Sequence, residues 1–242
     1  MMVNGLLITE KMKKIIKRIV SKLKLALKKQ KAKNVYNKYK DYTMIPSLIF
    51  IDNVLLCDNI SSINGCIVEC GVWRGGMIAG IYDYLELKRK CILFDSFEGL
   101  PNVRENDGDA AKIWQESNNG VGLDNCKAEI SFAEKAMKLA NSKDHNIVRG
   151  WFDQTLPIAN INEPIAILRL DGDWYDSTMV CLVNLYPLVA ENGIIIIDDY
   201  YAWDGCSRAV HDYLSQNNLP LRISQTTNGV CYIKNTKQGR KF

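Results

Sequence analysis

In Leu168-Arg-Leu-Asp171-Gly-Asp173-Trp-Tyr-Asp-Ser-Thr178, and again in Ile194-Ile-Ile-Ile-Asp198-Asp199-Tyr200, an apolar strand runs directly into carboxylates. The carboxyl ends of parallel strands meet at one edge of a sheet, so both runs can offer acids to one place. Magnesium and calcium prefer charged oxygen ligands, and adjacent carboxylates repel each other unless positive charge lies between them. An isolated Asp pair also suits a solvated loop, but two acidic strand ends flanking a helix predict a cation site.

Outward from these two stretches, short apolar runs alternate with longer helical ones. This alternation predicts a mostly parallel sheet with helices on both faces. Asn228-Gly229 between two terminal strand-like runs predicts a hairpin, which adds antiparallel strands at one edge. We therefore expect an α/β fold, a Rossmann-like class I methyltransferase sandwich with a seven-stranded sheet. Its predicted strands are 66–70, 91–95, 146–149, 165–170, 193–197, 219–225 and 230–234, and its predicted helices are 47–56, 77–87, 128–141, 177–189 and 207–216.

Length and composition favour a single catalytic domain, because 242 residues with 47% hydrophobic content can bury a substantial core without disulfides. Eight cysteines are scattered without a CxxC pair, and we expect them to be reduced core residues of a cytoplasmic protein. The segment 101–123 is too long for an ordinary connection and predicts a lid or substrate insertion. Its acids Glu105, Asp107 and Asp109 are expected to be solvated.

Charge divides the chain into a basic arm, residues 1–40, and an acidic domain, residues 41–242. The arm holds 13 Lys or Arg against the single acid Glu10, a net charge of +12, which leaves −8 for the rest of a chain whose total is +4. Apolar residues recur in it at helical spacing and predict an amphipathic helix, while lysines interrupt every apolar stretch and exclude a signal peptide or membrane span. These apolar residues are Met12, Ile15, Ile16, Ile19, Val20, Leu23, Ala26 and Leu27.

Three partners for this arm remain open: its own domain or a second subunit, an anionic membrane surface, and nucleic acid. The arm offers little aromatic interleaving for base stacking, so we expect no nucleic-acid partner. We expect a homo-oligomer in the cytoplasm, with peripheral attachment at the inner membrane face as the alternative use of the arm.

A glycine loop follows the first predicted strand, in Glu69-Cys-Gly71-Val-Trp-Arg74-Gly75-Gly76. Glycines allow a tight turn and a close ligand as the next helix starts. The G-x-G-x-x-G fingerprint of dinucleotide sites is absent, and an acid before the first glycine disfavours pyrophosphate and hence a nicotinamide-dependent dehydrogenase. A cationic ligand such as S-adenosylmethionine fits better, with Glu69 facing its positive charge and with Arg74 and the loop amides receiving its carboxylate. A tight turn without a ligand is the alternative.

Two further strand ends complete the predicted nucleoside side of the site. Asp95 and Ser96 follow the second strand, where doubly wound sheets place an acid that binds ribose hydroxyls. Trp151 and Phe152 follow the third strand and offer aromatic faces for an adenine ring, although such residues are as often plain core.

At this point the chain resembles the metal-dependent macrocin O-methyltransferases, a family that methylates sugar hydroxyls on macrolides, with relatives that act on aminocoumarin sugars. The resemblance covers roughly residues 41–235. The matching segments are Asp41-Tyr-Thr-Met44, VECGVWRGG at 68–76, LFDSFEGLP at 93–101, GWFDQTLP at 150–157, LRLDGDWYDST at 168–178 and IIIDDY at 195–200. The arm at 1–40 is not part of the family pattern.

The resemblance implies S-adenosylmethionine and Mg²⁺ as cofactors, with Asp171, Asp198 and Asp199 as metal ligands and Asp171 also as general base. It further implies that the segment with Thr43 and Met44 folds over the bound donor. The expected function is methyl transfer to a hydroxyl of a saccharide whose diol chelates the ion. A catechol-like phenol acceptor, or a non-catalytic protein that senses the donor and binds a membrane or partner, are the alternatives.

Overall fold

A mixed sheet forms the centre of the computed structural model, which describes residues 2–86, 88–118 and 124–236. Within these residues the sheet has seven strands. They are β1 (Cys66–Cys70), β2 (Cys91–Asp95), β3 (His145–Arg149), β4 (Ile165–Leu170), β5 (Val189–Ile197), β6 (Ile223–Gln225) and β7 (Cys231–Lys234). Their order in the sheet is β3-β2-β1-β4-β5-β7-β6.

Strand directions match the predicted topology. Strands β1 to β5 run parallel, whereas β7 pairs antiparallel with both β5 and β6. The seven-stranded sheet with an antiparallel C-terminal hairpin is therefore confirmed. The order reverses direction beside β1, between β1 and β4, and ligands of doubly wound sheets bind at such a point.

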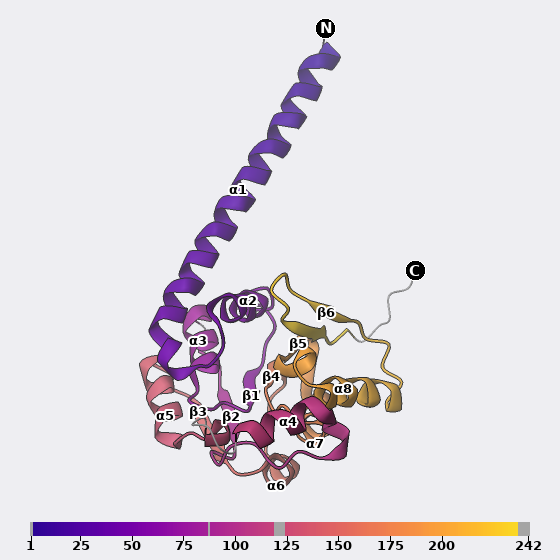
Figure 1. The fold of residues 1–242 in the computed structure, drawn as a ribbon. Coiled ribbons are helices and arrows are strands. Elements are labelled where there is room, and N and C mark those ends of the chain that lie inside the picture. The colour runs from indigo at the N-terminus through magenta and orange to yellow at the C-terminus, as the bar shows by residue number, and fades with distance from the viewer. Residues whose placement is uncertain (1, 87, 119–123, 237–242) are drawn as a thin grey trace.

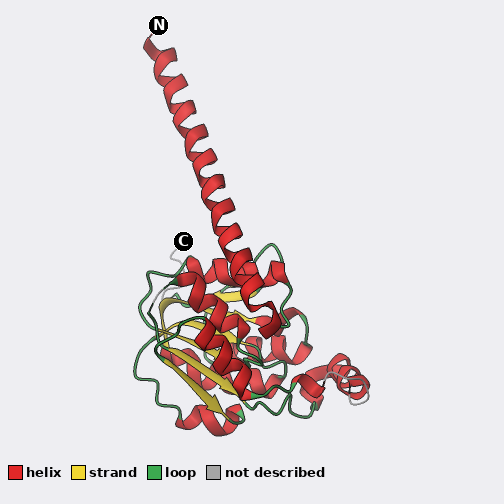
Figure 2. Cartoon of the chain, turned by 90° about the vertical axis from the view of Figure 1, so that its left-hand side faces the viewer, coloured by secondary structure: helices red, strands yellow, loops and turns green. Residues whose placement is uncertain are grey.

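Helices cover both faces of this sheet, as Figure 2 shows. The helices are α1 (Met2–Tyr39), α2 (Ser47–Asp58), α3 (Gly76–Leu85), α4 (Gly108–Asn118), α5 (Ile130–Leu139), α6 (Phe152–Thr155), α7 (Tyr175–Leu185) and α8 (Asp204–Gln216). The end of α1 packs with α2, α3 and α5 in one core, and α7 and α8 pack in the other. Alternate residues of β5 pack into the two cores: Ile194 and Ile196 belong to the first, and Ile195 and Ile197 belong to the second.

Several predicted elements are too long: 128–141 extends beyond α5, 219–225 extends beyond β6, and the helix before β5 is the clearest case. The helical pattern suggested 177–189, but α7 ends at Leu185 and a short 3₁₀ turn, Tyr186–Leu188, follows it. Pro187 in this turn has no backbone N–H to continue the helical ladder. Val189 then starts β5, so the strand begins earlier than the predicted 193.

The basic arm is one continuous helix, α1, that projects from the body (Figure 1). Only its C-terminal part docks: Ala32, Val35 and Tyr39 are buried. Ion pairs from Lys28 to Asp58 (2.6 Å), from Lys31 to Glu86 (2.6 Å) and from Lys38 to Asp83 (2.7 Å) surround this contact. Packing on its own domain, one of the predicted partners, is therefore restricted to the last turns of the arm. No helix among the described residues is long and apolar enough to cross a bilayer.

All eight cysteines carry free thiols, and seven of them are buried. The expectation of reduced core residues agrees with this arrangement. Cys126, the partly exposed one, lies at the cavity described next.

Candidate active site

A cavity of about 730 Å³ opens at the carboxyl ends of the parallel strands. Gly71, Asp95, Asp171 and Asp198, which follow or end β1, β2, β4 and β5, all line it. Of the predicted site residues, Met44, Ser96, Trp151, Phe152 and Asp199 also line this cavity, whereas Thr43, Glu69, Arg74 and Gly75 do not.

The glycine loop is held against the end of β4. Gly71 has φ +84°, and a Cβ there would lie 1.7 Å from the carbonyl oxygen of Asp171, so only glycine permits this approach. Gly75 has φ +78° and precedes α3, where its left-handed conformation starts the helix. The loop thus turns tightly beside the cavity, as its sequence predicted.

Asp95 organises this loop from the neighbouring strand. Its Oδ2 accepts the backbone N–H groups of Val72 (2.7 Å) and Trp73 (2.9 Å), and its Oδ1 accepts that of Phe97 (2.6 Å). Burial raises the pKa of Asp95, and these three hydrogen bonds oppose the rise. Ser96 is also engaged within the chain, because its hydroxyl donates to the Gly99 carbonyl (3.0 Å). A ribose contact by either side chain stays a prediction.

Arg169 lies at the centre of the site, fully buried in β4 between acids from three strands. Its Nη1 pairs with Glu69 (2.6 Å) and Asp171 (2.7 Å), and its Nη2 pairs with Asp198 (2.5 Å). Burial lowers the pKa of Arg169, but the charges of Asp198, Asp171 and Glu69 outweigh that effect and raise it well above the usual value. Sequence reasoning missed this residue, although an arginine inside an apolar strand signals that acids must surround it.

Glu69 therefore faces a cation of its own chain. Its second oxygen accepts the backbone N–H of Ile78 in α3 (3.1 Å). Burial raises the pKa of Glu69 to about 7, and Arg169 opposes that rise. Glu69 is buried and does not line the cavity. Its role toward a cationic ligand stays a prediction.

Asp171, Asp173 and Asp199 converge at the cavity, with one ligand oxygen of each within 4.8 Å of the others. Burial raises the pKa of Asp171 to about 6 and, with the charge of Asp171 adding to it, the pKa of Asp173 to about 7. Burial also raises the pKa of Asp199 well above its usual range, with the charge of Asp173 contributing. Asp199 is buried, and Asp171 and Asp173 are partly buried. Acids in such a setting that repel one another favour a cation between them, and three carboxylates suit a hard divalent ion.

This cluster differs from the ligand set that the family resemblance implied. Asp198 is not one of the three converging acids, and its Oδ1 pairs with Arg169. Asp173 takes part instead, in a left-handed conformation of φ +59° that is uncommon outside glycine. Trp203 Nε1 donates to Asp173 Oδ1 (2.9 Å), and the backbone N–H of Asp173 donates to Asp199 Oδ2 (3.0 Å).

The segment before α2 borders the other end of the cavity. Met44 contributes to the wall, but the Thr43 hydroxyl accepts the N–H of Ile45 (3.2 Å) within the segment. Arg74 does not line the cavity, and its guanidinium stacks over the rings of Trp73 and Phe132, at 4.3 and 4.6 Å from their centroids. The predicted role of Arg74 as a receptor for the donor's carboxylate finds no support in this placement.

The insertion at 101–123 contains a short 3₁₀ turn, Glu105–Asp107, followed by α4, and its residues 119–123 lie outside the described part. Asp107 corrects the prediction of solvated acids, because it is buried and accepts the N–H groups of Tyr175 (2.7 Å) and Arg104 (2.8 Å). Trp114 of α4 packs edge-on against Trp174 and Trp203, at 6.1 and 5.8 Å between ring centroids. The insertion is thereby anchored beside the acidic cluster.

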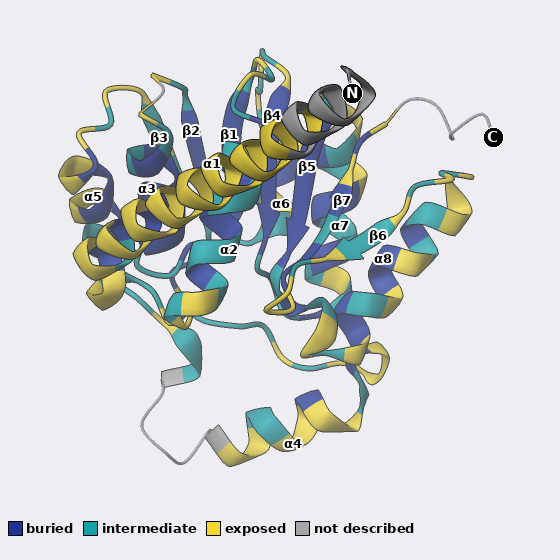
Figure 3. Cartoon of the chain, turned by 90° about the horizontal axis from the view of Figure 1, so that it is seen from above, coloured by how far each residue is buried: buried dark blue, intermediate teal, exposed yellow. Residues whose placement is uncertain are grey.

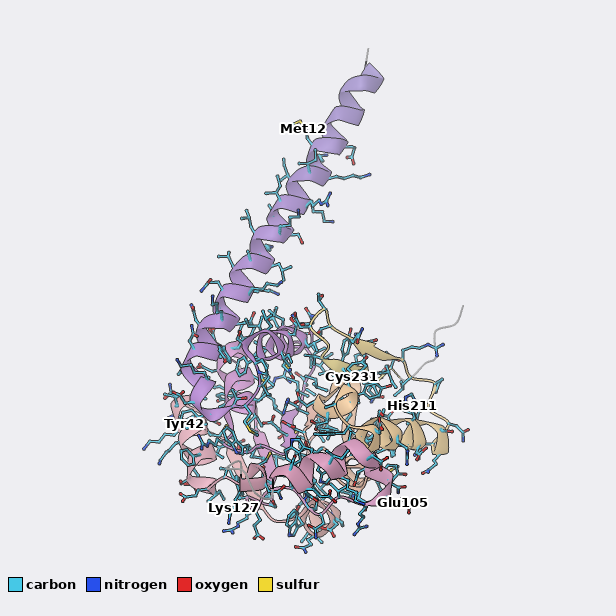
Figure 4. All side chains as sticks on the ribbon, viewed as in Figure 1. Met12, Tyr42, Glu105, Lys127, His211 and Cys231 are labelled. Atoms are coloured by element: carbon cyan, nitrogen blue, oxygen red, sulfur yellow. The ribbon has the colours of Figure 1, made fainter. Side chains whose placement is uncertain are left out.

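The two histidines lie outside the cavity lining. His211 in α8 shares a hydrogen bond with the Tyr200 hydroxyl (2.9 Å), and Figure 4 shows it on the outer side of the body. His145 starts β3. Neither histidine therefore borders the acidic cluster.

Comparison with known proteins adds independent information. The family model for macrocin-O-methyltransferase matches residues 13–234. The match includes most of the arm, so the expectation that residues 1–40 lie outside the family pattern is wrong from residue 13 onward. Demethyldecarbamoylnovobiocin O-methyltransferase of Streptomyces niveus is 34% identical over 165 residues, which cover 66% of this chain and 62% of that protein. The 8-demethyl-8-(2,3-dimethoxy-alpha-L-rhamnosyl)-tetracenomycin-C 4'-O-methyltransferase of Streptomyces olivaceus is 34% identical over 193 residues, 76% of this chain and 72% of that protein.

Among solved structures, the O-methyltransferase NovP superposes with a TM-score of 0.68 at 30% identity, over 81% of this chain and 83% of that one. The fold and the order of the site motifs agree with these matches, so the chain belongs to the macrocin-O-methyltransferase family.

Proposed function

We propose that this chain transfers a methyl group from S-adenosylmethionine to a hydroxyl of a saccharide, with a magnesium ion at the acidic cluster. The observation that carries this proposal is that Asp171, Asp173 and Asp199 converge on the cavity into which the glycine turn opens. Family membership supports the reaction, and the rhamnosyl group in one relative's name supports a saccharide acceptor.

Residues from three segments surround the place for the donor. Gly71 and Trp73 line it from the glycine loop, Met44 from the segment before α2, and Trp151 and Phe152 from the segment after β3. When bound, S-adenosylmethionine supplies a methyl group on a positively charged sulfur, which is already a good leaving group. The protein therefore contributes mainly by orienting the two reactants and by excluding water.

The acidic cluster fits a magnesium ion, because its donors are three carboxylates with an excess of negative charge. When bound there, magnesium lowers the pKa of a neighbouring hydroxyl and fixes its orientation. Asp171, Asp173 and Asp199 would hold the ion, and Asp198 stays a candidate beside them because it lines the same cavity.

Asp171 is proposed as the group that accepts the proton of the acceptor hydroxyl. The pair with Arg169 (2.7 Å) fixes one carboxylate oxygen of Asp171 at the cavity wall. The acceptor oxygen forms its new bond to the methyl carbon as the sulfur–carbon bond breaks, and the sulfur keeps the electron pair. Trp203 and the backbone of Asp173 hold the rest of the cluster in place during this step.

The test is methyl transfer from labelled donor with magnesium and two acceptor series, glycosides with vicinal hydroxyls and catechols. Asp199→Asn should lower turnover more than about a hundredfold, since the electrostatic contribution of a metal site is several kcal/mol. Donor binding, measured by calorimetry, should change little. Asp109→Asn is the matched control, because Asp109 is an exposed acid outside the cavity lining. Full activity of Asp199→Asn in the presence of a chelator would contradict the proposal. If only catechols gave a methylated product, the acceptor would be a catechol-like phenol and not a saccharide.

A further inference from the structure

The projecting part of α1 exposes an apolar stripe made of the residues that the sequence pattern singled out. Over Met12–Leu27, here called the free segment, Met12 is 56%, Leu23 59% and Leu27 71% exposed. Figure 3 shows this part of α1 as exposed along its length, and Figure 4 shows Met12 far from the body. Nothing in the described chain covers these side chains.

The orientation of the stripe explains why the domain does not cover it. At about 100° per residue, the apolar residues of the free segment fall within an arc of about 140°. Ala32, Val35 and Tyr39, which dock α1 on the body, lie about half a turn away from the centre of that arc. A straight helix that docks through one face therefore turns its stripe away from its own domain.

The lysines that flank the apolar stripe argue against a second copy of α1 as the partner that covers it. Lys13 and Lys24 flank one edge of the stripe, and Lys22 and Lys29 flank the other, whereas Glu10 is the single acid of residues 1–40. Two such helices packed along their stripes would bring lysine against lysine. The heptad pattern from Met12 to Ala26 also lasts only about two repeats, fewer than the three or four typical of a coiled coil.

We propose that the free segment of α1 binds the surface of an anionic lipid bilayer. The stripe enters the boundary between headgroups and acyl chains, and the flanking lysines extend to the lipid phosphates. The docked domain lies on the opposite side of the helix, so it clears the bilayer and faces water. This surface function is independent of the methyl transfer proposed above.

The experiment is flotation of the full-length chain with vesicles of phosphatidylcholine alone or with phosphatidylglycerol added. We expect recovery with the anionic vesicles, less with the neutral ones, and a decrease as salt screens the lysines. Leu23→Asn should lower the partition constant about tenfold, because the stripe loses one buried leucine. Leu25→Asn is the matched control: Leu25 is similarly exposed (49%) but lies on the lysine-rich face, so its loss should change little.

Two results would overturn the proposal. If Leu23→Asn and Leu25→Asn float equally well, or lose binding equally, the stripe does not insert into the bilayer. If light scattering without vesicles shows a dimer that Leu23→Asn dissociates and Leu25→Asn does not, the stripe is occupied by a second copy. The circular dichroism of both variants should match, which separates loss of binding from loss of helix.

Discussion

Positive charge is used in opposite ways at the centre of the sheet and along the free segment of α1. Arg169 is 1% exposed and is paired with three carboxylates. The lysines of the free segment are exposed, and the chain offers them almost no acids. A buried charge must find its partners within the fold, whereas an exposed charge costs little and remains available to a partner from outside.

The largest effect on stability and activity is expected from Arg169→Met, which tests the role of the buried charge. It leaves Glu69, Asp171 and Asp198 without their shared cation, and removing one partner of a buried ion pair typically costs about 3–5 kcal/mol. Urea unfolding followed by tryptophan fluorescence should show a lower midpoint, and methyl transfer should be lost. Arg169→Lys keeps the charge but loses the forked geometry of the guanidinium. Its urea midpoint should therefore lie between that of Arg169→Met and that of the native chain. An unchanged midpoint for Arg169→Met would mean that the acids are stable without the arginine.

A smaller effect is expected at Asp107, the buried acid of the insertion. Asp107→Ala removes the acceptor for the N–H groups of Tyr175 and Arg104, and hydrogen bonds to a charged group contribute about 1.5–3 kcal/mol. The same urea titration measures the loss. Glu105→Ala, two residues away and exposed, should change stability little. Equal effects of the two substitutions would show that burial of Asp107 does not anchor the insertion.

The smallest effect is expected at the surface. Lys31→Met removes the ion pair between Lys31 and Glu86, whose side chains are 44% and 72% exposed respectively. Ion pairs this exposed contribute about 0–1 kcal/mol. The unfolding midpoint should therefore stay close to that of the native chain at physiological salt. A loss as large as that of Arg169→Met would remove the distinction between buried and exposed charge in this protein.

Much of the fold could be predicted from the chain because its signals are local. Apolar runs such as Gly193–Ile197 mark strands, the Asn228-Gly229 turn marks the hairpin, and the glycines around Gly71 mark the turn after β1. The acids at 171, 198 and 199 follow strands, so their arrival at one edge of the sheet was predictable as well. The end of α7 was predicted too late, although Pro187 carried the signal.

The structure adds partners that the sequence did not reveal where contacts join residues distant in the chain. Asp198 and Asp173 both follow strands, but Asp198 pairs with Arg169 whereas Asp173 joins the cluster. Arg74 and Glu69 were assigned to the ligand, yet each meets a partner within the chain. Asp107 was expected in solvent, and the start of α7 covers it.

Taken alone, the amino-acid order determined the strand pattern, the glycine turn, the supply of carboxylates and the two-faced character of α1, because periodicity and turn chemistry act between residues close in the chain. Tertiary structure decided the pairing of Arg169, the membership of the acidic cluster and the direction in which α1 presents its stripe. Those outcomes depend on contacts between residues such as Glu69 and Arg169 that lie a hundred positions apart. Only the packed sheet brings them within reach of each other.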